Sequence, residues 1–157
     1  MTKTKIKSLK LTSRGRYAVM ALVELAHKMP EERWVPLSEI AHSGNISLSY
    51  LEQLFAGLRK NGLVRSYRGP GGGYLLAKDP SEIKLSEILM HAEDCVPAKR
   101  SRKTDKADAY GNKQTHALWG HIGEMLYVCT QHITLKDIMG QNVHENENFN
   151  KLIENFG

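Results

Sequence analysis

The chain has 157 residues, of which 25% are charged and 41% are hydrophobic. That length and composition are typical of a globular protein with one domain, or one small domain and an appended element. No apolar run approaches the roughly 18 residues of a membrane span. The basic first ten residues are not followed by the apolar segment of a secretory signal. We therefore expect a cytoplasmic protein without a membrane partner.

The net charge of +5 is concentrated in the N-terminal half. Residues 1–78 hold 13 Lys or Arg and 5 Asp or Glu, whereas residues 79–157 hold 9 and 12. A basic region of this kind is the electrostatic footprint of a nucleic-acid-binding surface. The phosphate-contact candidates on the arm and the start of the first helix are Lys10, Arg14 and Arg16. The first residues can equally be a disordered, solubilising tail.

The first predicted helix covers residues 13–28, whose core side carries apolar residues at helical spacing. Pro30 ends it, and Val35 is predicted to form a short strand that pairs with a later hairpin. A compact second helix is predicted for residues 37–43, and a glycine-containing turn leads from it into a third helix. This is the helix-turn-helix arrangement, in which the second helix of the pair enters the DNA major groove.

The third helix is predicted for residues 47–61. Ser47 and Ser49 both qualify as its N-cap, and Glu52, three residues after Ser49, fits a capping box. Gly62 stands where a left-handed residue is expected to end the helix. The buried face follows the i, i+3, i+4, i+7 spacing and consists of Leu51, Leu54, Phe55 and Leu58.

The opposite face of this helix carries polar side chains that suit DNA. Gln53 can pair bidentately with adenine, Glu52 can accept from the cytosine amino group, and Ser49 can bond to either. We take these three as base-contacting candidates. The phosphate-contact candidates on the same helix are Tyr50, Arg59 and Lys60. The alternative is an ordinary solvated helix face.

A β-hairpin is predicted next, with strands at residues 63–68 and 74–78. The segment between them, RGPGGG, cannot be helical. An enzymatic phosphate-binding loop is excluded, because no Gly-Lys-Ser/Thr follows and no helix opens after Gly73. The combination predicts a winged helix-turn-helix, with Arg68 reaching into a minor groove and Arg65 contacting phosphate at the base of the wing.

The C-terminal half is predicted to hold three more helices. A short amphipathic helix runs from residue 81 or 84 to about residue 90, and residues 96–113 are predicted to be a mobile loop whose basic residues touch DNA or are simply solvated. A longer helix at residues 116–131 is capped by Thr115. Its coiled-coil-like seam, widened by Trp119 and Leu126, consists of Leu118, Ile122, Met125 and Cys129.

This seam favours self-association, because DNA-binding domains of this type read two half-sites as dimers. Packing back onto the domain is the alternative. A last short helix is predicted at residues 133–139, and the tail from residue 141 is predicted to be loose. The predicted fold is mainly α with a small β-hairpin wing. Its parts are a winged helix-turn-helix domain with a basic arm at 1–95, a loop at 96–113, the dimerisation and final helices at 114–140, and the tail at 141–157.

Cysteine and histidine placement argues against catalysis and against a disulfide. Cys95 and Cys129 are too far apart in sequence for a metal knuckle, and a structural disulfide is not expected in the cytoplasm. We expect Cys129 to be a buried small hydrophobe. The histidines are scattered and no nucleophile–base pair stands out, so an enzyme is not expected.

Five segments together resemble the IscR-type, or Rrf-type, family of winged-helix transcriptional regulators. They are LTSRGRYAVMAL, ISLSYLEQLFAGLRKNGLV, RGPGGGYLLAKD, THALW and ITLKDI, and the resemblance covers residues 9–96 and 114–139. It implies a homodimer, formed through the long helix after the wing, that binds near-palindromic sites in double-stranded DNA. It also implies base contacts at positions already chosen for their chemistry, namely Ser49, Glu52, Gln53 and Arg68.

Many members of that family hold a [2Fe–2S] cluster on three cysteines and the histidine of THALW. Here the histidine is His116, but the three cysteine positions are occupied by Ser101, Ala107 and Lys113. Because cluster sites demand thiolates, we predict a regulator with no cluster, no metal and no other cofactor. The alternative is a [2Fe–2S] cluster or metal held by Cys95, His116 and a carboxylate such as Asp108.

The sequence thus predicts a homodimeric DNA-binding transcriptional regulator, connected by kinship with iron–sulfur or iron homeostasis. Two other functions remain open. One is a sensor that holds a cluster or another small ligand in the loop before the long helix. The other is an adaptor that uses its winged helix to dock proteins.

Overall fold

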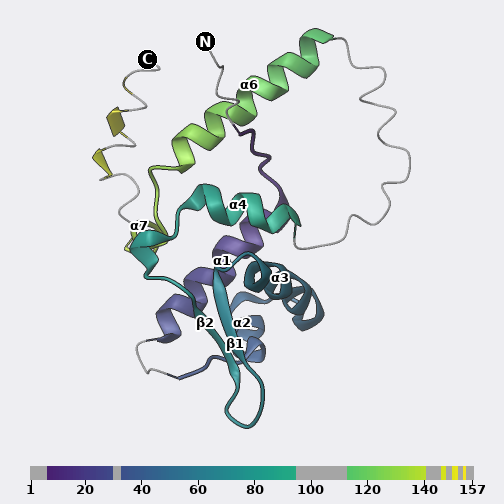
Figure 1. Ribbon diagram of the computed structural model, residues 1–157, viewed down its shortest axis with the longest axis vertical. Helices are drawn as coiled ribbons and strands as arrows, with labels where there is room; N and C mark the ends of the chain where they lie inside the picture. The colour runs from purple at the N-terminus through teal and green to yellow at the C-terminus, as the bar shows by residue number, and fades with distance from the viewer. Residues whose placement is uncertain are drawn as a thin grey trace.

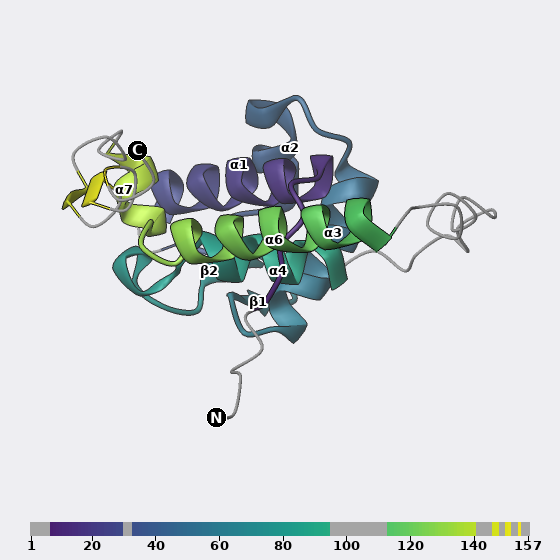
Figure 2. The same cartoon turned by 90° about the horizontal axis from the view of Figure 1, so that it is seen from above.

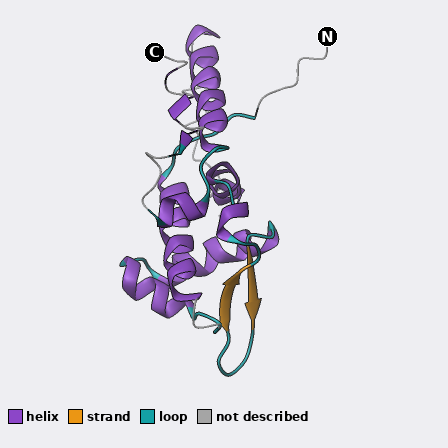
Figure 3. Ribbon diagram, turned by 90° about the vertical axis from the view of Figure 1, so that its left-hand side faces the viewer, coloured by secondary structure: helices purple, strands orange, loops and turns teal. Residues whose placement is uncertain are grey.

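The computed structural model describes residues 7–29, 33–94 and 113–140, together with residues 146, 147, 150, 151 and 154. Within these ranges the chain is mainly helical, with one two-stranded antiparallel sheet (Figures 1 and 3). The hairpin lies at one end of the long axis and α6 (Lys113–Thr130) lies at the other (Figure 1). This confirms the predicted fold class. None of the described helices has the length and apolar character needed to cross a membrane.

Helix α1 (Ser13–Lys28) lies at the centre of the core. The Thr12 hydroxyl caps it by accepting a hydrogen bond of 3.3 Å from the Gly15 amide. The helix packs against α2 (Leu37–Gly44), α4 (Leu85–Asp94), the second strand of the hairpin and α7 (Leu135–Met139). Its Leu22 and Leu25 are completely buried, and burying a leucine fully stabilises a fold by about 1.5–3 kcal/mol. The helix is therefore the element on which the others are assembled.

Helix α3 (Leu48–Lys60) buries the apolar face that the sequence predicts. Gly62 is left-handed, with φ of 75°, and its amide donates to the Arg59 carbonyl, which confirms the predicted helix end. The predicted Ser49–Glu52 capping box is wrong. The helix begins at Leu48 with Ser47 as its N-cap, so Ser49 already lies inside the first turn and its side chain is exposed.

The wing consists of β1 (Val64–Tyr67) and β2 (Gly73–Leu76), which pair in the register Val64↔Leu76 to Tyr67↔Gly73. A third extended segment joins them, as predicted. The Val35 amide donates to the Tyr74 carbonyl at 3.0 Å, and the Tyr74 amide donates back to the Val35 carbonyl at 2.8 Å. The base of the wing is thereby fixed to the chain that leads into α2.

Of the two starts predicted for the next helix, residues 81 and 84, the structure supports the later one within a single residue, and a separate turn precedes it. A 3₁₀ turn, η2 (Pro80–Glu82), is capped by Asp79, and α4 begins only at Leu85 and continues to Asp94. The division occurs because Ile83 is extended and its carbonyl is bonded to the Leu135 amide at 2.8 Å. The Leu85 amide similarly donates to the Ile133 carbonyl at 2.8 Å. These two bonds hold the C-terminal end of α6 and the start of α7 against the rest of the domain.

Helix α6 overlies α4 when the molecule is seen from above (Figure 2). It begins at Lys113, so Thr115 lies inside the helix and the prediction that it is the cap is wrong. Helix α7 is capped by Thr134, whose hydroxyl accepts from the Asp137 amide while the Asp137 carboxylate accepts from Thr134.

Several sequence predictions fall on residues outside the described ranges. These include the loop at 96–113 apart from Lys113, together with Cys95 and most of the tail. Within the tail, Asn146 donates to the His132 carbonyl at 2.8 Å and to the Asp137 carboxylate at 3.2 Å. This residue is therefore anchored beside α7, although the sequence predicts a loose tail.

Candidate DNA-binding surface

The turn between α2 and α3 fixes the angle of the helix-turn-helix. Asn45 is left-handed, with φ of 49°, a conformation that asparagine tolerates better than most residues. Ile46 follows it into the core, with 8% of its surface exposed, and its amide donates to the Ala41 carbonyl at 3.0 Å. The chain therefore turns sharply and delivers Ser47 to the start of α3.

The three predicted base readers share the outer face of α3. Ser49, Glu52 and Gln53 are all exposed, while their neighbours Leu51 and Leu54 are completely buried. Positions three and four apart lie on one side of a helix. The N-terminal turns of α3 thus present a hydroxyl, a carboxylate and an amide together, which is the set of groups suited to base edges.

Aromatic contacts tie α3 to its neighbours. Tyr50 is half-buried and meets Tyr17 of α1 edge-on, with ring centroids 5.5 Å apart. Phe55 meets Tyr74 of β2 edge-on at 5.0 Å. Helix α3 is therefore held between α1 and the wing, and the predicted phosphate contact Tyr50 sits at the junction of α3 with α1.

At its C-terminal end α3 is linked directly to the wing. The guanidinium of Arg59 donates to the hydroxyl of Ser66 in β1 at 3.2 Å. Lys60 is exposed at the last position of the helix. Arg59 thus has a structural partner in addition to the phosphate contact that the sequence predicts for it.

The wing places both of its predicted arginines on the surface. Arg65 is exposed within β1, and Arg68 is exposed directly after the strand. The glycines of the tip allow the tight return of the chain, with φ of 70° at Gly71. A methyl group at Gly73 would overlap the Val35 carbonyl and lie 2.8 Å from the Pro36 nitrogen. Gly73 is therefore required for the close approach of Val35 to the wing.

The wing is also supported from the side of α2. Trp34 packs on Tyr67, and its neighbour Arg33 makes a paired ion bridge to Glu39, with nitrogen–oxygen distances of 2.9 and 2.8 Å. These hydrogen bonds from Arg33 lower the pKa of the Glu39 carboxyl below its ordinary value, and the charges of Arg33 and Lys28 act in the same direction. Arg33 and Trp34, which lead into α2, thus contact α2 and the wing respectively.

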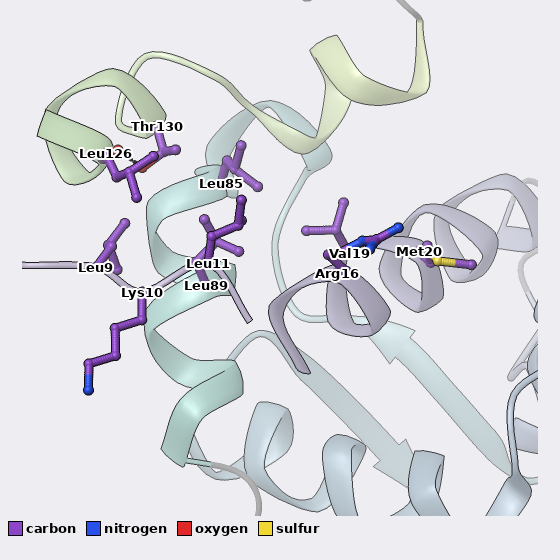
Figure 4. Close-up of a pocket in the computed structure, with 10 residues that line it drawn as sticks. All are labelled: Leu9, Lys10, Leu11, Arg16, Val19, Met20, Leu85, Leu89, Leu126 and Thr130. Atoms are coloured by element: carbon purple, nitrogen blue, oxygen red, sulfur yellow. Dashed lines mark hydrogen bonds between the residues drawn. The ribbon is translucent and has the colours of Figure 1, made fainter. Parts of the chain in front are cut away.

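The remaining predicted phosphate contacts lie nearer to α6. Arg14 is half-buried at the start of α1. Lys10 and Arg16 line a mostly apolar groove of about 320 Å³ between the N-terminal arm, α1, α4 and α6 (Figure 4). The described part of the arm runs from α6 past α4 to the start of α1, whereas the wing tip lies at the opposite end of the long axis from α6 (Figures 1 and 3). The structure therefore separates Lys10 from the wing arginines and does not form one continuous patch from all the predicted residues.

The predicted seam of α6 lies on the surface of the single chain. Leu118, Ile122 and Met125 are exposed by 53%, 38% and 47%. Trp119 is exposed by 67%, and Cys129 is half-buried with a free thiol. Packing back onto the domain, the alternative considered for this helix, therefore does not cover these side chains within the described residues.

His116 is exposed in the first turns of α6. Among the described residues, no group of three or more His, Cys, Asp or Glu side chains is arranged to hold a metal ion. The positions of Cys95, Ser101, Ala107 and Asp108 are outside the described ranges.

Sequence reasoning missed the aromatic residues that support the surface. Tyr67 was expected only to favour the first strand and Trp34 was given no role, although the register of Val35 on the wing brings the two together. In that register Trp34 lies opposite Leu75, which pairs with Arg65, so Trp34 shares a sheet face with Arg65 and Tyr67. Tyr17 was expected on the core side of the first helix, but it is 39% exposed and contacts Tyr50 instead.

Comparisons with known proteins agree on one family. The Rrf2 family, described as an iron-dependent transcriptional regulator, matches residues 11–141. The HTH-type transcriptional regulator IscR of Photorhabdus laumondii is 44% identical over 131 residues, covering 83% of this chain and 79% of the relative. IscR of Klebsiella pneumoniae is 46% identical over 131 residues, with coverages of 83% and 80%.

Solved structures give the same result. The structure of T. potens IscR has a TM-score of 0.64 and 34% identity, and the match covers 85% of this chain and 88% of that one. CymR, the global cysteine regulator of B. subtilis, has a TM-score of 0.63 and 32% identity, with coverages of 85% and 98%. The chain therefore belongs to the Rrf2 family and is a winged-helix, DNA-binding transcriptional regulator of the IscR type.

Proposed function

We propose that the protein acts as a homodimer that binds near-palindromic promoter sites in double-stranded DNA. The observation that carries this proposal is the presence of two exposed surfaces on one chain. One is the polar outer face of α3 with the wing arginines, and the other is the apolar face of α6. A dimer through α6 would present two copies of the first surface, as a two-fold symmetric site requires.

In this proposal α3 enters the major groove by its N-terminal turns. Ser49, Glu52 and Gln53 read base edges there, and Arg68 enters the adjacent minor groove, where the negative potential is enhanced. Phosphate contacts position the protein and supply most of the salt-dependent affinity. They are assigned to Lys10, Arg14, Arg16, Tyr50, Arg59, Lys60 and Arg65.

The dimer contact is assigned to the seam of α6. Large apolar side chains exposed together on one helix face mark an interaction surface rather than an ordinary solvated face. Trp119 adds an amphipathic ring of the kind enriched at interfaces. The proposed seam consists of Leu118, Ile122, Met125 and the partly buried Cys129.

We further propose a role in iron–sulfur or iron homeostasis, without a cluster of the protein's own and without catalysis. The family description and the IscR relatives support the first part. The side-chain chemistry supports the second, because the alanine and lysine at two of the three cysteine positions do not ligate iron in the ordinary way. Since the proposed partner is chromosomal DNA, the protein is expected to act in the cytoplasm.

Light scattering and selection of bound genomic fragments test the proposal. We expect the mass of a dimer and a set of enriched fragments that share a near-palindrome. Ile122→Asp should dissociate the dimer, because it places a charge in the seam. Ala117→Asp is the matched control, since Ala117 is exposed on α6 outside the seam, and this variant should stay dimeric. A monomeric wild-type chain that enriches no fragment would overturn the proposal.

Anaerobic purification separates the cofactor-free regulator from a sensor that holds a cluster. We expect a colourless protein without bound iron or acid-labile sulfide. A brown protein that loses its visible absorbance on His116→Ala would instead establish a cluster with a non-standard ligand set.

A further inference from the structure

The N-terminal arm lies against α6 before the chain enters α1 (Figure 1). The amide of Leu9 donates a hydrogen bond of 3.0 Å to the carbonyl oxygen of Gly123, in the middle of α6. Leu9 itself is only 5% exposed. A flexible, solvent-exposed arm would show neither feature. Residues 8 and 9 are therefore packed against α6.

The docking depends on the absence of a side chain at Gly123. A methyl group there would overlap the Ser8 hydroxyl and lie 2.8 Å from the Leu9 carbonyl oxygen. Gly120, one turn earlier in α6, has no atom within 4 Å of the same position. The two glycines of α6 therefore differ. The arm packs directly on Gly123, whereas no atom lies close enough to Gly120 to be displaced by a side chain there.

The side chain of Leu9 lies among leucines from both neighbouring helices (Figure 4). Leu85 and Leu89 come from α4, and Leu126 comes from α6. Leu9 thus acts as a wedge between α4 and α6. Helix α6 also packs directly on α4, and Leu9 lies where the two helices meet.

The same arm is continuous with the cap of α1. Thr12 caps α1 and also donates a hydrogen bond to the carboxylate of Glu93 at the end of α4. The arm therefore connects α6 to α1 and α4 within a few residues. The residues that receive Leu9, on α4 and α6, lie within the segment matched by the family, residues 11–141.

We infer that Leu9 and Gly123 determine the spacing of the DNA half-sites that this protein accepts. The inference rests on the proposed homodimer. If α6 pairs with its copy, the distance and rotation between the two α3 helices depend on the angle between α6 and its own winged domain. The wedge fixes that angle at the middle of α6, and half-site spacing follows from the geometry of the dimer.

The test compares Gly123→Ala with Gly120→Ala in the full-length protein. Alanine has a higher helix propensity than glycine, so neither substitution should destabilise α6. Only Gly123→Ala should expel the arm. Trypsin cleavage after Lys10, followed by mass spectrometry, reports the release, and we expect it to be about tenfold faster in Gly123→Ala than in wild type or Gly120→Ala. Leu9→Ala, which leaves α6 unchanged, provides a second way to remove the wedge.

Binding is then measured on the fragment selected by the wild-type protein and on two copies with one base pair added or removed at its centre. We expect wild type and Gly120→Ala to prefer the original spacing by about tenfold or more, and Gly123→Ala and Leu9→Ala to prefer it by about threefold or less. Affinity for an isolated half-site should be the same in wild type and Gly120→Ala, and in Gly123→Ala and Leu9→Ala it should fall by no more than the loss of the single phosphate contact from Lys10 allows.

Each contrary result has its own meaning. A dimer in which Gly123→Ala releases the arm but keeps the full spacing preference would overturn the inference alone. So would a wild-type dimer that binds all three spacings equally, or a Gly123→Ala variant whose arm stays protected. A monomeric wild-type chain would overturn the proposed dimer and this inference with it.

Discussion

The indole of Trp34 lies against the ring of Tyr67, with centroids 5.7 Å apart and the ring planes tilted by 31°. Trp34 belongs to the extended segment that enters α2, and Tyr67 is the last residue of β1. Arg68 follows Tyr67 directly. The aromatic pair therefore steadies the point of the wing from which the proposed minor-groove arginine extends.

Trp34→Ala should weaken binding to the selected DNA site by acting through Arg68. Aromatic pairs of this type contribute about 0.5–1.5 kcal/mol beyond their burial, which corresponds to about a two- to tenfold loss of affinity. Trp34→Phe keeps a ring in place and should retain most of the affinity. Titrations of both variants with specific and random duplex are the measurement.

A double-mutant cycle distinguishes positioning of Arg68 from general damage to the wing. In an Arg68→Ala background, Trp34→Ala should cost nothing further. Equal losses in both backgrounds would show that Trp34 does not act through the arginine.

Gln53→Ala should cost about 1–3 kcal/mol on the selected site and relax discrimination at one base pair, since it removes a bidentate donor–acceptor pair. Binding to random duplex should be unchanged, because the side chain is exposed on α3 and carries no charge. Systematic single-base variants of the site provide the measurement. An equal loss on random duplex would rule out Gln53 as a base reader.

Glu52→Ala should raise affinity for random duplex. The carboxylate can accept from cytosine, but it repels phosphates wherever no amino group meets it, so its main effect is to reject wrong sequences. Glu52→Gln keeps the shape without the charge and should behave like Glu52→Ala on random DNA. Unchanged nonspecific binding in both variants would contradict this role.

The Arg33–Glu39 bridge should make a small, pH-dependent contribution to stability. Because Arg33 lowers the pKa of Glu39, the contribution is present above the carboxyl's ordinary pKa and is lost as the pH falls through the lowered one. Both side chains are well exposed, at 40% and 38%, so the stabilisation is modest. Arg33→Gln should raise the pKa of Glu39 towards its ordinary value in an NMR titration. An unmoved titration would show that the bridge does not persist in solution.

The helices and the hairpin could be predicted because their signals are local. The face of α3 formed by Leu51, Leu54, Phe55 and Leu58 follows helical periodicity, and Gly62 marks its end. These features depend on a few residues of chain and not on distant contacts. The pairing of Val35 with the wing was also predicted, although its partner Tyr74 lies far along the chain.

The errors arose where distant contacts override local signals. Ile83 interrupts a good helical pattern because its carbonyl is bonded to Leu135, more than fifty positions away. Thr115 has the side chain of a cap, yet α6 begins two residues before it. The docking of Leu9 on Gly123 has no local signature, since a basic arm and a glycine in a helix are each unremarkable alone.

The bonds that join Ile133 to Leu85 and Leu135 to Ile83 have a mechanical consequence. A helix fixed at one end can change its slope but cannot slide along its axis. Lys113 begins the other end of α6, and between the two ends the backbone bond from Leu9 to Gly123 holds the helix a second time. Any change at that second point would therefore alter the slope of α6 relative to the winged domain.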